Sequence, residues 1–245
     1  MAGHPTPVQH AARTASTNED ARSAFDAGDS GPIWLTAEQQ TGGVGRRGRA
    51  WWTGKGNFAG TLLWPVERNS LRYPAGFSFG AGLAVIEALA ACDAPSGHHS
   101  LKWPNDVLQD GAKVAGILCE FLTAKGRQCV AIGIGVNLQA APPDMPYDVA
   151  AVSDLGVTVP SETFLKALDE RLTTRVQQLV SGDFAGICAD WWNHAAGRMG
   201  PVTVRQGDEP RHGNFVGLGP NGELLLDQSG KIVTISAADV FIGGN

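Results

Sequence analysis

The chain has 245 residues, 43% of them hydrophobic, and a formal net charge of −5. This length suffices for one large domain or for a large and a small one, and the acidic balance argues against nucleic acid as the main partner, because nucleic-acid-binding domains usually carry a basic excess. The sequence shows no apolar leader and no C-x-x-C pair among its four cysteines, so we expect a cytoplasmic protein with reduced thiols, no membrane association and no metal site recognisable from a direct motif.

The first predicted element is a helix that begins at a capping box. Ser16 and Glu19 have the S-x-x-E spacing in which each side chain bonds the backbone amide of the other. Gly28 suits the left-handed position that follows a helix end, so we expect the helix to stop there. Short strands are expected at 33–37 and 58–64, with a glycine-rich loop between them at 40–56.

The middle of the chain predicts a buried helix followed by strands. Residues 76–91 are mostly apolar, but glycines and Glu87 favour a core helix over a membrane span. Turn residues between Asn105 and Lys113 favour a hairpin. Further strands are expected at 101–103, 114–121 and 130–138, and further helices at 161–180 and 184–196.

The character of the sequence changes at about Gly200, where short strand-like runs alternate with Gly, Pro and Asn turns. This pattern is typical of a small β-barrel or sandwich. The earlier helices and strands do not alternate regularly, which favours an α+β fold with a mixed sheet and flanking helices over a doubly wound one. We therefore predict two domains, 1–197 and 198–245, anchored to each other by Trp191 and Trp192. The expected C-terminal strands are 202–205, 213–218, 223–226 and 231–235.

The most informative segment for chemistry is GGVGRRGR at 42–49. Glycines let a backbone approach a ligand closely and turn its amides toward an anion. Three arginines concentrate guanidinium groups, which bind phosphate or carboxylate through paired hydrogen bonds. The segment is not a Walker A loop, and no helix-forming run follows it as in a dinucleotide fingerprint. Taken singly, it fits a solvated surface loop equally well.

Two further segments carry polar side chains at strand ends. KWPND at 102–106 combines a cation, an aromatic ring, a fixed turn and the Asp106 carboxylate, which could orient a nucleotide or a metal. Lys113 precedes an apolar strand, where its ammonium group can meet a negative ligand. In GIGVNL at 133–138 the alternate glycines open one strand face, which also carries Asn137. Taken singly, each lysine is better explained as an exposed charge at a strand end, and GIGVNL could be no more than a close strand–helix contact.

In their order and spacing, the segments make the chain similar to the biotin–protein ligases, in the form without an N-terminal DNA-binding domain. The matching stretches are STN at 16–18, AEQQ at 37–40, GRRGRAW at 45–51, KWPNDVL at 102–108, KVAGIL at 113–118 and GIGVNL at 133–138. The resemblance implies a biotin/lipoate ligase-type catalytic domain and a small SH3-like C-terminal β-barrel. It also implies formation of biotinyl-5′-AMP from biotin and ATP with Mg²⁺, and transfer of biotin to a lysine of a biotin carboxyl carrier domain.

The resemblance also assigns roles to individual residues. Biotin is expected to contact Ser16, Thr17, Asn18, Gln40, Gly43, Gly45, Arg46, Lys113, Gly116, Gly133 and Gly135. ATP is expected to contact Arg46, Arg47, Arg49, Trp51, Asn105, Asp106 and Asn137. The residues expected to act in catalysis are Arg46, Lys102, Asp106 and Lys113. Trp51 is expected to belong to a loop that folds over the adenylate.

One departure from the family pattern leaves alternatives open. The family loop usually has an arginine where this chain has Val44, which suggests weaker biotin or adenylate binding with activity kept. The alternatives are a lipoate or octanoate ligase of the same fold, and a biotin- or adenylate-binding protein that has lost catalysis. A DNA-binding regulator would need a helix-turn-helix module before Ser16, for which too few residues precede it. The acceptor's identity and the choice between monomer and homodimer are not determined by the sequence.

Overall fold

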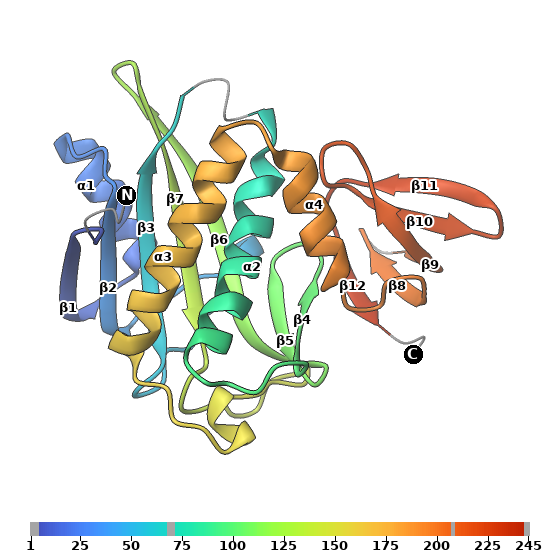
Figure 1. Ribbon diagram of the computed structural model, residues 1–245, viewed down its shortest axis with the longest axis horizontal. Coiled ribbons are helices and arrows are strands. Elements are labelled where there is room, and N and C mark those ends of the chain that lie inside the picture. Colours follow the sequence, from blue (N-terminus) through green and yellow to red (C-terminus); the bar gives the residue numbers. More distant parts are fainter. Residues whose placement is uncertain (1–4, 68–71, 207–208, 243–245) are drawn as a thin grey trace.

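The computed structural model describes residues 5–67, 72–206 and 209–242, and these residues form two sheets and four α-helices (Figure 1). The domain limits at residues 1 and 245 lie outside the described part. The strands of the first sheet are β1 (Val8–Thr14), β2 (Ile33–Gln40), β3 (Phe58–Pro65), β4 (His99–Lys102), β5 (Asp106–Gln109), β6 (Ala112–Ala124) and β7 (Arg127–Val136). Those of the second sheet are β8 (Pro201–Arg205), β9 (Pro210–Leu218), β10 (Leu224–Gln228), β11 (Lys231–Ile235) and β12 (Asp239–Ile242). The α-helices are α1 (Thr17–Ala27), α2 (Pro74–Ala91), α3 (Ser161–Val180) and α4 (Phe184–Asn193).

The first sheet is mixed, as predicted. Its strand order is β1-β2-β3-β7-β6-β5-β4. The β1–β2 pair is parallel, and the other neighbours are antiparallel. The long β6–β7 hairpin lies at the centre and pairs Gly116 with Gly135, so two glycines face one another on the sheet.

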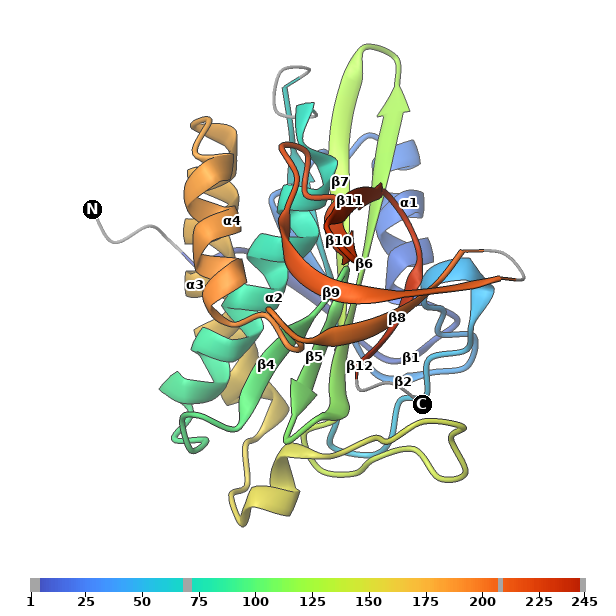
Figure 2. The same ribbon diagram turned by 90° about the vertical axis from the view of Figure 1, so that its right-hand side faces the viewer.

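Alternation of side chains along the central strands gives the first sheet two buried faces. Ile33 and Leu35 pack with Phe25 of α1 on one face, whereas Trp34 belongs to the larger core on the other. Because successive side chains of a strand point to opposite faces, one strand serves both cores. The fold is α+β, with α1 on one side of the mixed sheet and α2 and α3 on the other (Figure 2).

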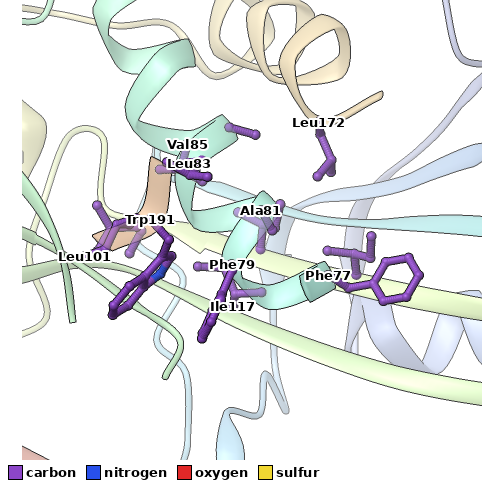
Figure 3. Packing of buried hydrophobic residues seen from close by; sticks show 14 of the residues in the cluster. Phe77, Phe79, Ala81, Leu83, Val85, Leu101, Ile117, Leu172 and Trp191 are labelled. Atoms are coloured by element: carbon purple, nitrogen blue, oxygen red, sulfur yellow. The ribbon is translucent and has the colours of Figure 1, made fainter. Parts of the chain in front are cut away.

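Helix α2 is the centre of the larger core. It is the one described helix that is long and apolar enough to cross a membrane, but 61% of that window is buried within the protein. Figure 3 shows its side chains packed against β6, α3 and α4, with Phe79 beside Trp191. The centres of these two rings are 4.8 Å apart. The apolar composition of α2 therefore supplies the core.

The second sheet is antiparallel, in the order β11-β10-β9-β8-β12. Its end strands do not pair with each other, so the predicted barrel is open, which remains compatible with an SH3-like arrangement. Trp192 and Trp191 reach it from α4, with ring centres 5.0 and 6.4 Å from that of Phe215 on β9. This contact is the predicted anchor, and Figure 2 views the molecule from the side of the second sheet.

The start of α1 was predicted correctly, but its capping interaction was not. Gly28 has the expected left-handed conformation, with φ 115°. Ser16 occupies the N-cap position, yet its side chain makes no capping hydrogen bond, so the capping-box prediction is wrong. The physical reason is that Ser16 is 2% exposed and lines a cavity, where its hydroxyl is available to a ligand rather than to the helix.

Candidate functional site

A cavity of about 670 Å³ opens between the first sheet, the arginine loop (residues 42–51) and β12 of the second sheet. It brings together most of the predicted site residues from six separate stretches of the chain. These are Ser16, Thr17, Asn18, Gln40, Gly45, Arg46, Arg49, Trp51, Lys102, Asn105, Asp106, Lys113, Gly116, Gly133 and Gly135.

Three predicted site residues lie outside this lining. Gly43 accepts a backbone hydrogen bond from Trp51 at 2.7 Å and so shapes the arginine loop. Arg47 donates to Asp239 at 2.9 Å. Asn137 is 2% exposed, and its side-chain amide donates to the carbonyl of Ala150 at 3.1 Å. It therefore holds the segment around Ala150 in place and does not itself line the cavity.

One end of the cavity carries neutral polar groups at the start of α1. Gln40 accepts hydrogen bonds from the backbone amide of Thr17 at 2.9 Å and from its hydroxyl at 3.2 Å. The hydroxyl of Thr61 lies 2.7 Å from Oδ1 of Asn18, and Nδ2 of Asn18 donates to Glu120 at 2.8 Å. Both the oxygen and the nitrogen of the Asn18 amide therefore have a partner, which fixes the orientation of this amide. This end of the cavity thus presents donors and acceptors in set positions.

Gly133 leaves room for Asn18. A Cβ atom at Gly133 would lie 2.0 Å from Oδ1 of Asn18, a distance that real side chains do not allow. The glycine therefore permits α1 to place its first turn directly against β7. The sequence predicts an open strand face at Gly133, and in the structure the side chain of Asn18 lies against that face.

Trp51 lies over the paired glycines of β6 and β7. A Cβ atom at Gly135 would lie 2.3 Å from the Trp51 indole, and one at Gly116 would lie 3.1 Å from it. The Lys113 ammonium nitrogen is 5.6 Å from the centre of a Trp51 ring. The indole thus forms an apolar wall beside the positively charged part of the cavity.

The arginine loop is a small hairpin. Val44 and Ala50 form an isolated antiparallel bridge, and the amide of Gly45 donates to the carbonyl of Arg49 at 2.7 Å. At its tip Arg47 is left-handed, with φ 57°. The turn directs Arg46 back toward the 102–106 segment, where it donates to the side chain of Asn105 at 3.1 Å.

The 102–106 segment places a carboxylate between cations. Lys102 and Asp106 are cross-strand partners on β4 and β5, and Asp106 forms an ion pair with Lys113 at 2.8 Å. Burial lowers the pKa of Arg46, with a further decrease from Arg47. Burial likewise lowers the pKa of Lys102. The cavity concentrates positive charge that is partly removed from water, an arrangement suited to a multiply charged anion.

Sequence reasoning missed the wall formed by the second sheet. Asp239 and Phe241 of β12 line the cavity, as do Tyr147 and Asp148 of the loop before α3. Strand β12 has only four residues and no motif, and its neighbour in the sheet, β8, begins at Pro201, far back in the chain. Local pattern alone carried no indication that these residues approach the arginine loop.

Comparison with known proteins assigns the family. The Biotin/lipoate A/B protein ligase family matches residues 11–137, and the Biotin protein ligase C terminal domain matches residues 201–243. The chain is 40% identical over 240 residues to a biotin--[acetyl-CoA-carboxylase] ligase of Paracoccus denitrificans, covering 95% of this chain and 99% of that one. The chain belongs to the biotin/lipoate ligase family.

Other members of this family agree in sequence and fold. A biotin--[acetyl-CoA-carboxylase] ligase of Mycobacterium tuberculosis is 34% identical over 235 residues, which covers 94% of this chain and 86% of the relative. The biotin protein ligase of Aquifex aeolicus, solved in complex with biotin and ATP, superposes with a TM-score of 0.83 at 23% identity, covering 97% of this chain and 99% of that one. At this identity the structural likeness establishes the fold.

Proposed function

We propose that this protein is a biotin–protein ligase, which joins biotin to ATP as biotinyl-5′-AMP and transfers the biotinyl group to a lysine of a biotin carboxyl carrier domain. One observation carries the proposal. A single cavity holds a neutral hydrogen-bonding end, at Thr17 and Asn18, and a cationic end, at Arg46 and Lys113. Biotin has the matching distribution, because a neutral ureido ring and a carboxylate lie at its opposite ends.

The neutral end suits the ureido ring. Thr17, Asn18 and Gln40 are already bonded to one another or to neighbouring strands, so their orientations are set before a ligand arrives, and such preorganisation lowers the entropic cost of binding. The apolar wall of Trp51 and the glycine-lined face of β6 and β7 suit the thiophane ring and the valeryl chain. In this arrangement the carboxylate extends toward Lys113.

In the first step a carboxylate oxygen of biotin attacks the α-phosphate of ATP. A new O–P bond forms, the bond from that phosphorus to the bridging oxygen breaks, and pyrophosphate leaves with the electron pair. Lys113 and Arg46 hold the carboxylate and the oxygens on which negative charge accumulates, and fixed cations in a partly dehydrated site lower this barrier. Arg49 and Asn105 line the same part of the cavity and orient the phosphates.

In the second step an amine of the acceptor attacks the acyl carbon of biotinyl-5′-AMP. A C–N bond forms, the C–O bond to phosphate breaks, AMP leaves and the amine loses a proton. Trp51 and the arginine loop cover the mixed anhydride, because exclusion of water protects it from hydrolysis. Asp106 keeps Lys113 in place through their ion pair and helps position the reacting groups.

Mg²⁺ fits the site only together with ATP. The described residues contain no cluster of three His, Cys, Asp or Glu side chains that could hold a metal by itself. Mg²⁺ typically binds one or two carboxylates plus substrate phosphates, and Asp106 is the carboxylate we assign to it. When bound, the ion neutralises phosphate charge.

We further propose that the protein is cytoplasmic and acts as a monomer or homodimer. Neither nucleic acid nor a membrane takes part in the proposed reaction.

The test is mass spectrometry of a biotin carboxyl carrier domain incubated with the protein, Mg-ATP and either biotin or lipoate. We expect an ATP-dependent biotinyl adduct that is absent with Lys113→Ala and present with Lys166→Ala, an exposed lysine of α3. An adduct with lipoate alone would establish a lipoate ligase instead. Measurable biotin binding without any adduct would establish a binding protein.

A further inference from the structure

The side-chain amide of Asn18 presents its oxygen to the neutral end of the cavity. A Cβ atom at Gly133, which lines the cavity, would lie 2.0 Å from Oδ1 of Asn18 but 3.2 Å from Nδ2. The oxygen and the nitrogen of an amide occupy nearly equivalent positions, so hydrogen-bonding partners alone decide which of the two faces a given direction. A reversed Asn18 amide would offer the ligand a donor in place of an acceptor.

Thr61 does not by itself decide the orientation of this amide. Its hydroxyl lies 2.7 Å from Oδ1 of Asn18 and 2.8 Å from the hydroxyl of Thr17. A hydroxyl has one proton and two lone pairs. The Thr61 hydroxyl can therefore donate to an oxygen of Asn18, or it can donate to Thr17 and accept from a nitrogen of Asn18. Both arrangements satisfy every group.

Glu120 of β6 removes this ambiguity. One of its carboxylate oxygens accepts from Nδ2 of Asn18 at 2.8 Å, and an ionised carboxylate can only accept. The amide nitrogen must therefore face Glu120, which leaves the oxygen on the cavity side. The carbonyl of Leu118 would favour the same orientation, but at 3.5 Å from Nδ2 it lies beyond the usual hydrogen-bond range.

Arg22 holds Glu120 in this position. Its guanidinium group donates to the other carboxylate oxygen at 2.7 Å, and it lies one helical turn after Asn18 on α1. Residues four apart on a helix share a face, so both groups approach Glu120 from the same element. Neither Glu120 nor Arg22 is among the residues that line the cavity. Any effect of this ion pair on a ligand must therefore pass through Asn18.

We propose that Glu120, held by Arg22, is a positioning residue that sets the preference of the cavity for a cyclic urea. The inference rests on the proposed function and deepens it. The ureido ring of biotin carries two N–H donors, which match a fixed acceptor at Asn18. The dithiolane ring of lipoate carries no N–H donor, and a buried group built to bond a donor discriminates against a ligand that lacks one.

The test is a graded series at position 120 in an Arg22→Ala background, where no guanidinium group competes for the side chain. Glutamate only accepts, glutamine in Glu120→Gln can accept or donate, and lysine in Glu120→Lys only donates. Glutamine satisfies both orientations of Asn18, so about half of the protein stays competent and the dissociation constant for biotin should rise about twofold. Lysine favours the reversed orientation, and the constant should rise about tenfold or more.

The direction of this change separates positioning from simple electrostatics. Biotin is an anion, so removing a negative charge or adding a positive one should tighten its binding if charge alone acts. Glu170→Gln and Glu170→Lys in the same background are the matched controls, because Glu170 is an exposed glutamate of α3. These controls should not weaken biotin. The affinity for ATP, measured without biotin, should not fall in any member of the series.

The orientation of Asn18 can also be followed without a ligand. In NMR spectra, the side-chain amide signal that is lost in Asn18→Ala belongs to Asn18. In the wild type its Nδ2 protons should show a nuclear Overhauser contact to the side chain of Glu120, and in the lysine variant this contact should move to Thr61.

Two results would overturn the inference. Equal biotin affinity across the series would show that Glu120 does not position Asn18, and a parallel loss of ATP affinity would indicate a general disturbance of the fold. The proposed function fails differently, through absence of acceptor biotinylation by the wild type. The NMR contacts can be measured in either case, so the two failures are distinguishable.

Discussion

Asp239 of the second sheet accepts a hydrogen bond from Arg47 of the arginine loop, with 2.9 Å between the carboxylate oxygen and the guanidinium nitrogen. The same carboxylate also pairs with Arg49. The side chains of the two arginines are 47% and 59% exposed, so these ion pairs are screened by solvent and contribute little to folding stability. Their effect is to tie the loop over the cavity to the second sheet.

Asp239→Asn should loosen the arginine loop without unfolding the protein. We expect the free energy of unfolding to change by less than about 1 kcal/mol, as for other exposed ion pairs, whereas trypsin should cleave faster after the loop arginines of the ligand-free protein. Denaturant unfolding and time-resolved peptide mass spectrometry measure the two effects. Asp26→Asn removes an exposed charge from α1 and serves as the control. Equal cleavage of both variants would show that Asp239 does not hold the loop.

Gly135→Ala should weaken biotin binding through Trp51. The added methyl group would lie 2.3 Å from the indole, which forces Trp51 out of its position, and overpacking of this kind costs about 1–3 kcal/mol. If the bound state needs the indole in place, the dissociation constant for biotin rises roughly five- to 150-fold. Titration calorimetry measures it.

Two comparisons isolate this effect. Gly217→Ala, also in a strand, adds a methyl group that meets only an ordinary contact at 3.6 Å from Leu225 and should bind biotin normally. In a Trp51→Ala background, Gly135→Ala should have little further effect, because the group it displaces is gone. A full additional loss there would mean that the methyl group acts on biotin itself.

The sequence predicts correctly those helices and strands whose determinants lie within the element itself. Helix α3 occupies 161–180 as predicted, because its periodic apolar residues all face one core. Gly28 ends α1 through its own backbone freedom. Strand β1 was missed because it lies at the edge of the sheet and is largely exposed, so it shows no alternation of apolar and polar residues.

The candidate site divides in the same way. Lys102, Asp106 and Lys113 were predicted as site residues because strand-end charges occur close together in the sequence, and the β4–β5 and β5–β6 pairings place all three at one cavity. Asp239 and Phe241 reach that cavity because the second sheet packs against α4 through Trp191 and Trp192 and is bonded to Trp103 through the Gly222 carbonyl. This is a tertiary contact between distant segments, and no spacing in the sequence encodes it.

Trp103→Phe should destabilise the contact between the two sheets. The Trp103 ring is 3% exposed, and its indole nitrogen donates to the carbonyl of Gly222 in the β9–β10 turn at 2.9 Å. Phenylalanine fills much of the space but leaves that carbonyl unpaired, which costs about 1–3 kcal/mol. Denaturant unfolding should report this loss. Trp52→Phe changes a ring that is 42% exposed and should shift stability by less than about 0.5 kcal/mol; similar losses for both would contradict the role of the Trp103 hydrogen bond.

Val44→Arg tests the departure of the arginine loop from the family pattern. Val44 lines the cavity, is 43% exposed, and is held by its bridge to Ala50, so an arginine at this position has room to extend toward a bound carboxylate or phosphate. One charge-assisted hydrogen bond contributes about 1.5–3 kcal/mol, roughly ten- to 150-fold in affinity. We therefore expect tighter binding of biotin or biotinyl-5′-AMP, measured by calorimetry.

Val8→Arg is the control, because it adds the same charge at an exposed position on β1 and should not change either affinity. If Val44→Arg binds both ligands no more tightly than this control, the arginine of the family pattern serves the shape of the loop, and Val44 costs this enzyme nothing in ligand affinity.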